Sequence, residues 1–263
     1  MSIGTLQSAI TGQFFGKING NNSTFVNNYY EGEFVNGNGS AGTVSGDTPV
    51  EVNADQLKSG EVTAKLGFAY RQNIGDDETP VLDPTHAFVA EITEAGYATL
   101  YVEDSDISIP EGVEAFAGVE DGEYLKLNAI EGKIAAGEPV VLKGAAGFYS
   151  FAPTTDAVSA EQNHLFGAAE DTDAAGKYVL AKPEGKPAGF YLADKGTIKA
   201  GKAYLLQAEG VKAFLFSEES ETAIGNVNVN DNVNAGVIYN LSGQRLNKAQ
   251  KGINIVNGKK VLK

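Results

Sequence analysis

The hydrophobic and polar positions of the second half of the chain follow one pattern twice. The segments GKIAAGEPVVLKGAAGFYSF (132–151) and GTIKAGKAYLLQAEGVKAFLF (196–216) align without a gap over their first eleven residues, at an offset of 196 − 132 = 64. Each begins with a Gly turn, continues through an Ala-Gly or Lys-Ala-Gly turn into a Val/Leu/Tyr run, and ends in an aromatic strand. Two copies of a strand–turn–strand unit predict an all-β body built by repetition.

Residues 1 to about 46 have a different texture. Phe, Tyr and Val are spaced among Gly, Asn, Ser and Thr, as in GKINGNNSTFVNNYYEGEFVNGNGSAGTVSG. Short strands separated by Asn/Gly turns, which tolerate positive φ, are typical of a β-solenoid coil. Because an isolated coil cannot bury its own face, we expect this piece to be the terminal turn of a longer stack.

A helix is predicted directly after this segment. Asn53 or Asp55 can cap it, and Leu57, Val62 and Leu66 supply an apolar side before Gly67. The solenoid remnant and this helical or loop cap together are expected to span residues 1–86.

Residues 20–86 resemble the tail that closes arrays of GLUG-type repeats in Bacteroidota surface proteins. The resemblance rests on Gln56, Leu57, Ser59, Gly60 and Glu61, and then on Gln72, Ile74, Gly75, Asp76, Pro80, Val81, Leu82, Asp83, Thr85 and His86. It implies that this region follows the last repeat of such an array, and that the chain begins partway through a longer protein.

Residues 87–152 and 153–220 are predicted to form two tandem, duplicated β-sandwich-like units. The run GYATLYV (96–102) is a strong strand signal and Pro110-Glu111-Gly112 a strong turn signal. The pattern from GYATLYV to EPVVLKG resembles β-sandwich modules near the C-termini of Bacteroidota surface proteins, and that resemblance implies a non-enzymatic module.

The last segment, 225–263, reads as a linker followed by a short β-hairpin tail. GVIYNLSGQRLNKAQKGINIVNGKKVLK resembles the end of type IX secretion sorting domains through Tyr239, Gly243, Gly252, Ile255, Asn257 and Gly258, among other residues. The resemblance implies a partner in the secretion machinery. Asn257-Gly258 also favours a type I′ turn between two strands.

Composition and charge narrow the function classes. The chain has 263 residues, a formal net charge of −14, no cysteine and no apolar run long enough to span a membrane. An acidic chain without a basic face is not expected to bind nucleic acid, and the absence of cysteine excludes disulfides and thiolate chemistry. The N-terminal sequence shows no signal peptide.

Side chains that carry chemistry are few. His86 and His164 have no accompanying nucleophile motif, so we predict no catalytic site and no enzyme. Asp104, Asp106, Asp171 and Asp173 are the candidate metal ligands; Asp171-Thr172-Asp173 begins like a calcium loop, but Ala175 and Lys182 fail the EF-hand pattern. No cofactor is expected apart from calcium at these loops.

Exposed aromatic residues are the candidate ligand contacts. In adjacent pairs such as Phe148-Tyr149 and Phe190-Tyr191, the two side chains of a strand point to opposite faces. Tyr149, Phe190 and Tyr191 are therefore the candidate binding residues.

Two function hypotheses follow. The first is a non-catalytic, extracellular cell-surface display or adhesion protein, whose β modules present or space repeats toward a host or polysaccharide ligand and whose tail directs secretion or anchoring. The second is a carbohydrate-binding accessory module of a larger secreted enzyme.

Overall fold

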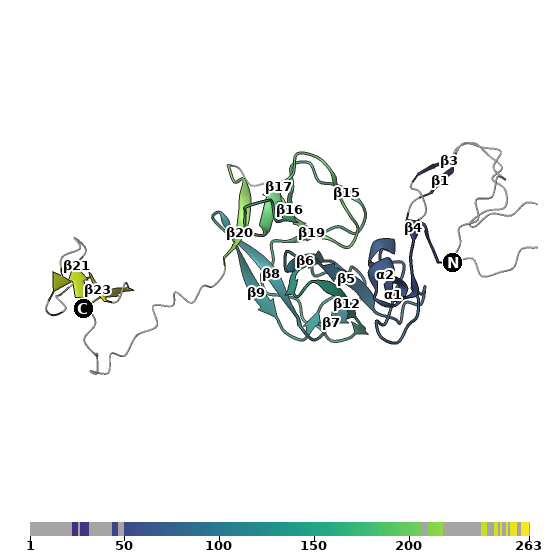
Figure 1. The fold of residues 1–263 in the computed structure, drawn as a ribbon, viewed down its shortest axis with the longest axis horizontal. Coiled ribbons are helices and arrows are strands. Elements are labelled where there is room, and N and C mark those ends of the chain that lie inside the picture. The colour runs from purple at the N-terminus through teal and green to yellow at the C-terminus, as the bar shows by residue number, and fades with distance from the viewer. Residues whose placement is uncertain are drawn as a thin grey trace, which may run out of the picture. The chain divides into compact units, whose positions relative to one another are not determined.

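A computed structural model of the protein describes residues 23–25, 27–31, 44–46, 50–206, 210–217, 238–240, 245–246, 248, 251, 253–256 and 259–262. The chain separates into two compact units, Met1–Glu218 and Glu219–Lys263. Among the described residues, the regular structure of both units is mainly strand, so the predicted all-β class is confirmed (Figure 1). Among the described residues, no helix is long and apolar enough to cross a membrane.

The first strands pair in parallel at one fixed offset. They are β1 (Ser23–Phe25), β2 (Tyr29–Tyr30), β3 (Val44–Gly46) and β4 (Val50–Glu51). Ser23 lies opposite Val44 and Tyr29 opposite Val50, so both ladders join residues 21 positions apart (44 − 23 and 50 − 29). Parallel pairing at a constant offset is the hydrogen-bonding pattern of one solenoid coil stacked on the next.

Two short helices follow, α1 (Ala54–Lys58) and α2 (Glu61–Leu66). The predicted cap is confirmed: Asn53 accepts from the Gln56 N–H, and the Gln56 side chain accepts from the Asn53 N–H, forming a capping box. Gly60 separates the helices at φ +87°, where an added Cβ would lie 2.5 Å from Ile74 Cδ1. Leu57 and Val62 form a small core with Val52 of the preceding segment and Tyr29 of β2.

The rest of the first unit carries sixteen strands that fall into two sets. The first set is β5 (Phe88–Ile92), β6 (Tyr97–Leu100), β7 (Asp106–Ser108), β8 (Val113–Asp121), β9 (Tyr124–Ile130), β10 (Lys133–Ile134), β11 (Val140–Gly144), β12 (Gly147–Phe151) and β13 (Pro153–Thr154). The second set is β14 (Phe166–Gly167), β15 (Thr172–Asp173), β16 (Tyr178–Ala181), β17 (Gly189–Leu192), β18 (Thr197–Ile198), β19 (Ala203–Leu205) and β20 (Ala213–Ser217).

One nine-stranded sheet runs through both sets, in the order β14-β19-β16-β17-β20-β9-β8-β11-β6. Read from its two ends, the sheet repeats itself: β6-β11-β8-β9 on one side corresponds to β14-β19-β16-β17 on the other. The aligned sequence copies occupy matching places, since β10 and β18 are equivalent, as are β11 and β19. The duplication is thus a duplication of strand order, and the two halves share one sheet through β20. We call β6–β11–β8–β9 the first half-sheet and β14–β19–β16–β17 the second half-sheet.

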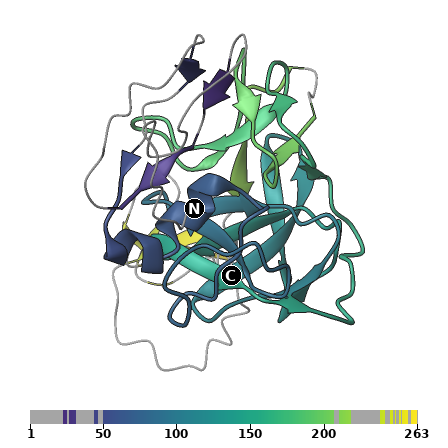
Figure 2. The same ribbon diagram turned by 90° about the vertical axis from the view of Figure 1, so that its right-hand side faces the viewer.

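The two ends of the sheet approach each other, so that it nearly closes (Figures 1 and 2). The Tyr101 N–H after β6 donates to Gly201 O at 2.8 Å, and the Ala203 N–H of β19 donates to Thr99 Oγ1 at 3.1 Å. Side chains from both half-sheets form one core with Leu165, which precedes β14, and Phe214 of β20. The half-sheet residues in this core include Leu125, Val141, Tyr178, Phe190 and Leu205.

The outer faces of the two half-sheets are covered differently. The first is covered by the β12-β5 pair and by the three-stranded sheet β10-β7-β13, over a core that includes Ile92, Leu100, Ile107, Ile134 and Val140. The second is covered by the β15-β18 pair, over Ala168, Ala174 and Ile198.

The second compact unit contains β21 (Ile238–Asn240), β22 (Arg245–Leu246), β23 (Ile253–Val256) and β24 (Lys259–Leu262). They form an antiparallel sheet in the order β22-β21-β23-β24. This agrees with the short β-hairpin tail expected from the sequence. The finer boundaries predicted at residues 86, 152 and 220 remain predictions.

Candidate functional site

The segment that resembles the repeat tail links the helix pair to the β body. Gln72 is fully buried: its amide nitrogen donates to Leu57 O at 2.8 Å, and its amide oxygen accepts from the Thr63 hydroxyl. The Ser150 hydroxyl of β12 donates to Gln72 O at 2.9 Å and accepts from the Ile74 N–H at 3.0 Å. These bonds fix the helix pair to the β12-β5 pair.

His86 lies in the same segment. Its Nδ1 lies 2.8 Å from Asp77 Oδ2, and that carboxylate oxygen also accepts from the Asn73 N–H. Because the ring is engaged by the loop that carries it, His86 holds this loop in place. His164 is half exposed, and its Nδ1 accepts from the Glu120 N–H at 3.3 Å. Among the described residues, neither histidine forms a hydrogen bond with a serine or threonine hydroxyl, so neither is part of a nucleophile–base pair there.

Two of the four candidate metal ligands occupy equivalent positions in the duplication. Asp106 accepts from the Ala136 N–H at 2.8 Å, and Asp171 accepts from the Ala200 N–H at 3.1 Å; Ala136 and Ala200 are aligned residues of the two sequence copies. The second oxygen of Asp106 accepts from the Ala157 N–H, and that of Asp171 from the Lys199 ammonium. These bonds hold the pKa of each carboxyl below its usual range, chiefly through the Ala136 N–H for Asp106 and through Lys199 for Asp171.

The other two acids lie apart from any cluster. Asp173 accepts from the Ala175 N–H at 3.0 Å within its own turn, and Asp104 is exposed. Within the part of the chain that the structure describes, no group of three or more His, Cys, Asp or Glu side chains is arranged to hold a metal ion. Asp106 and Asp171 thus have a structural role as turn-holding carboxylates. Calcium binding stays a prediction.

The neighbouring candidates Phe190 and Tyr191 point to opposite faces of β17, because side chains alternate along a strand. Phe190 is fully buried in the inner core, where its ring meets Phe216 edge-on, so it packs the fold and is closed to a ligand. Tyr191, its neighbour on β17, is half-buried on the outer face, and its hydroxyl donates to Pro187 O. Tyr149 is half-buried on β12, with its hydroxyl donating to Ala145 O.

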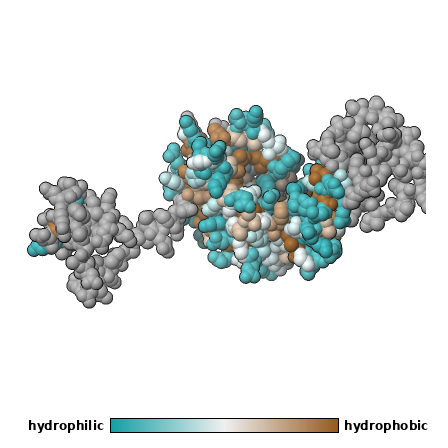
Figure 3. All heavy atoms as spheres, in the orientation of Figure 1, coloured by the Kyte–Doolittle hydropathy of each residue, from teal (hydrophilic) through white to brown (hydrophobic). Residues whose placement is uncertain are grey.

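Tyr191 is part of a row that the sequence did not single out. Tyr191 lies opposite Val179, Val179 opposite Tyr204, and Tyr204 opposite Phe166, so these residues cross four strands on the same face. The Phe166 and Tyr204 rings stack at 6.0 Å, and Phe166 is 45% exposed. On the face shown in Figure 3, hydrophobic residues reach the surface in patches between hydrophilic ones. We call Phe166, Tyr204, Val179 and Tyr191 the outer row.

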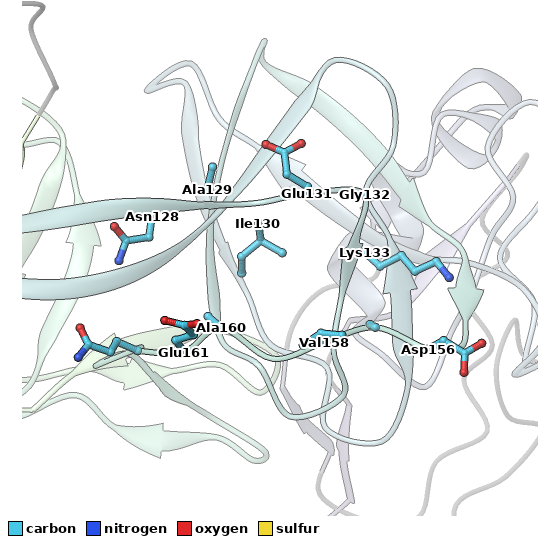
Figure 4. A pocket seen from close by; sticks show the side chains of 12 residues that line it. Asn128, Ala129, Ile130, Glu131, Gly132, Lys133, Asp156, Val158, Ala160 and Glu161 are labelled. Carbon is cyan, nitrogen blue, oxygen red and sulfur yellow. The ribbon is translucent and has the colours of Figure 1, made fainter.

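A groove of about 660 Å³ lies along the end of β9, under the loop at 156–162. In Figure 4 the Ile130 side chain points from the strand toward the loop residues Val158 and Ala160, whereas Glu131 points away. The carboxylates of Glu131 and Asp156 do not converge on a common point in this view. Glu161 is the third acid that lines the groove.

In the tail, two of the sorting-like residues are brought together. Tyr239 of β21 lies directly opposite Ile255 of β23. Val256 pairs with Lys259 across β23 and β24. Gly243, Gly252, Asn257 and Gly258 lie outside the described residues.

Comparisons with protein-family models, with curated proteins and with solved structures give no match.

Proposed function

We propose that this chain is a non-catalytic cell-surface protein, of the kind found in Bacteroidota, whose β body supports a stacked repeat segment and whose tail directs secretion or anchoring. The observation that carries the proposal is the pair of parallel ladders, both at an offset of 21 residues, leading into the capped helix pair. The Val52 N–H donates to Tyr30 O, so the ladder continues to the residue before the cap.

The junction between ladder and body supports a presenting role. Val52, Leu57 and Val62 are buried together, and Tyr29 of β2 packs against them. The helices are then held to β12 by the Gln72 and Ser150 hydrogen bonds described above. These contacts join the ladder to the β body.

Disrupting the junction tests this role. We expect Leu57→Asp to remove hydrogen-exchange protection from residues 28–31 and 50–52 while residues 88–206 stay protected, because a buried carboxylate breaks the small core only. Val50→Asp is the matched control, since Val50 is 51% exposed, and it should leave protection unchanged. Full protection in Leu57→Asp would contradict the presenting role.

The proposed role of the tail rests on its being a compact unit of its own. Residues 219–263 form their own compact unit, as a removable sorting or anchoring module would. In native cells, we expect the wild-type protein to be digested by external protease and a chain ending at residue 224 to be protected inside. The intact mass of the surface species should show whether the tail is removed. Equal surface exposure of both chains would refute the secretion role.

The outer row favours the second candidate, a carbohydrate-binding accessory module. Half-exposed rings on one sheet face can stack against sugar rings, and Lys186 and Lys177 lie 5.8 Å from the Tyr191 and Tyr204 ring centres. On a glycan array, an accessory module would bind a defined sugar, and the Tyr191→Ala variant would lose this binding. Tyr124→Ala, at a 54% exposed tyrosine on β9, is the control. A spacer would bind no sugar in either form.

A further inference from the structure

A pocket of about 460 Å³ opens at the seam where the two ends of the nine-stranded sheet meet. We call it the seam pocket. Its walls come from both sides of the duplication: Glu91, Thr93, Tyr97 and Thr99 from the first, and Lys182, Lys195, Thr197, Lys199 and Lys202 from the second, with several alanines between them. The volume is within the range of pockets that enclose small ligands.

The charge of the seam pocket is opposite to that of the chain. Four lysines and one glutamate line it, in a protein whose formal net charge is −14. Lys199 is already paired with Asp171 at 2.7 Å. Lys182 and Lys195 are exposed at the rim, so both remain available to an incoming anion.

Lys202 is the deepest of the four. Burial lowers its pKa below the usual lysine range, and the Glu91 carboxylate opposes this shift in part. Yet none of the ion pairs or side-chain hydrogen bonds formed by the described residues includes the Lys202 ammonium. A partly buried ammonium that makes no ion pair or hydrogen bond is unfavourable, and Glu91 offsets this cost only in part, so a ligand that supplies a hydrogen-bonded anionic group would stabilise it.

The duplication supplies an internal reference for this position. Lys202 aligns with Glu138, and both follow the repeated Ala-Gly turn, with the Glu138 N–H donating to Ala135 O and the Lys202 N–H to Lys199 O. The Glu138 carboxylate is buried and accepts a hydrogen bond from Asn163 Nδ2. The fold therefore satisfies the charged group at one copy of the position and leaves the other facing a cavity.

We propose that the seam pocket binds a small ligand through an anionic group, a carboxylate or a phosphate. The Lys202 ammonium contacts this group at depth, and Lys182 and Lys195 hold it from the rim. The Thr99 hydroxyl oxygen already accepts the Ala203 N–H, which leaves the hydroxyl proton to donate to the ligand. This proposal does not depend on where the protein resides.

The test is calorimetric titration with three hexose probes at constant ionic strength. Glucuronate carries a carboxylate, glucose 6-phosphate a phosphate, and glucose neither. We expect at least one of the two anionic probes to bind and glucose not to bind. Which anionic probe binds identifies the anionic group. If neither binds at millimolar concentration, or if glucose binds equally well, the proposal is wrong.

Variants assign the binding to the pocket. Lys202→Met keeps the length of the side chain and removes its charge, and we expect affinity for the anionic probe to fall about ten- to hundredfold. Lys126→Met, at an exposed position on β9 outside the pocket, should bind as the wild type does. Unchanged affinity in Lys202→Met would overturn the assignment. Should that variant fail to fold, the double variant Lys182→Gln/Lys195→Gln, at exposed positions, must weaken binding.

Discussion

The two half-sheets share a strand order but not an environment. Leu100 on β6 and Phe166 on β14 occupy equivalent positions, opposite Val140 and Tyr204 respectively. Leu100 is 1% exposed and Phe166 is 45% exposed. The same face of the duplicated sheet is therefore core in the first half and partly surface in the second.

This difference in exposure arises because the third strand of each sequence copy pairs differently. In the first copy, β12 leaves the sheet and pairs with β5, and together they cover the outer face. In the second copy, β20 stays in the sheet, antiparallel to β17 and parallel to β9. One copy of the strand completes a second layer, and the other joins the two half-sheets. The second half-sheet therefore has no strand equivalent to β12 over its outer face, and the β15-β18 pair is what covers it.

The strongest test of this comparison uses the equivalent isoleucines Ile134 and Ile198. Both are buried, but Ile134 lies in the large core of the first half and Ile198 in the small core under β15 and β18. We expect Ile134→Ala to lower the free energy of unfolding by about 4 kcal/mol and Ile198→Ala by about 2 kcal/mol. Urea denaturation measures both, and equal losses would show that the two outer cores are equally packed.

The aligned glycines Gly137 and Gly201 give the next largest effect. Both have positive φ, +75° and +80°, so alanine is strained at either site. At Gly201 an added Cβ would also lie 2.2 Å from Phe68 Cε2, whereas at Gly137 the nearest atom is 3.8 Å away. We expect Gly137→Ala to lower the free energy of unfolding by about 1 kcal/mol and Gly201→Ala by about 3 kcal/mol. Thermal unfolding of the pair measures the difference, and the comparison fails if Gly137→Ala is the more damaging.

A smaller difference is expected between the contributions of Asp106 and Asp171 to the stability of the fold. Asp106 accepts two backbone N–H bonds and Asp171 accepts one, together with an exposed lysine. Since both pKa values are lowered, each carboxylate stabilises the fold above the ordinary pKa of aspartate, and this contribution is lost as the pH falls through the lowered pKa. Asp106→Asn should reduce thermal stability at pH 7 more than Asp171→Asn and should flatten the acid limb of the stability curve. The reverse order would indicate that the Lys199 pair matters more than the second backbone bond.

The smallest effect concerns the opposite charges at Glu138 and Lys202. Because burial lowers the pKa of Lys202, the unfolded chain binds more protons between that pKa and the ordinary lysine pKa of about 10.4. Stability should therefore rise with pH through this window in the wild type, and the rise should be smaller in Lys202→Met. Denaturant titrations at several alkaline pH values measure the slope. An identical slope in the variant would mean that Lys202 has an ordinary pKa.

The sequence alone predicts much of the duplication. The gapless match from Gly132 to Leu142 with Gly196 to Leu206 located the equivalent strands β10/β18 and β11/β19, because turn residues and apolar alternation are local signals. It could not locate the partners of β12 and β20. Both segments are alternating aromatic strands, and their pairing depends on β5 and β9, which lie far away in the chain.

The candidate sites were harder to predict. The sequence makes Asp106 and Asp171 candidate calcium ligands, since acids in turns are compatible with either role, and only the positions of Ala136 and Ala200 show that they hold turns. Lys202 was not singled out. A signal was present in the alignment, where Lys202 stands opposite Glu138 directly after the shared Ala-Gly pair, but burial of these groups is a property of the folded sheet.

The parallel pairing of β20 with β9 has a consequence for how the chain reaches its native state. Leu215 lies beside Tyr124, so the ladder joins residues 91 positions apart (215 − 124), whereas β8 and β9 meet through a hairpin. Contacts between residues so distant in sequence form late, because closing a long loop has an entropic cost that local hairpins avoid. During synthesis, β9 emerges long before β20 and must wait with an unpaired edge. The open edge of a strand is also where two chains can pair by mistake, so the interval before β20 docks is when this protein is most exposed to aggregation.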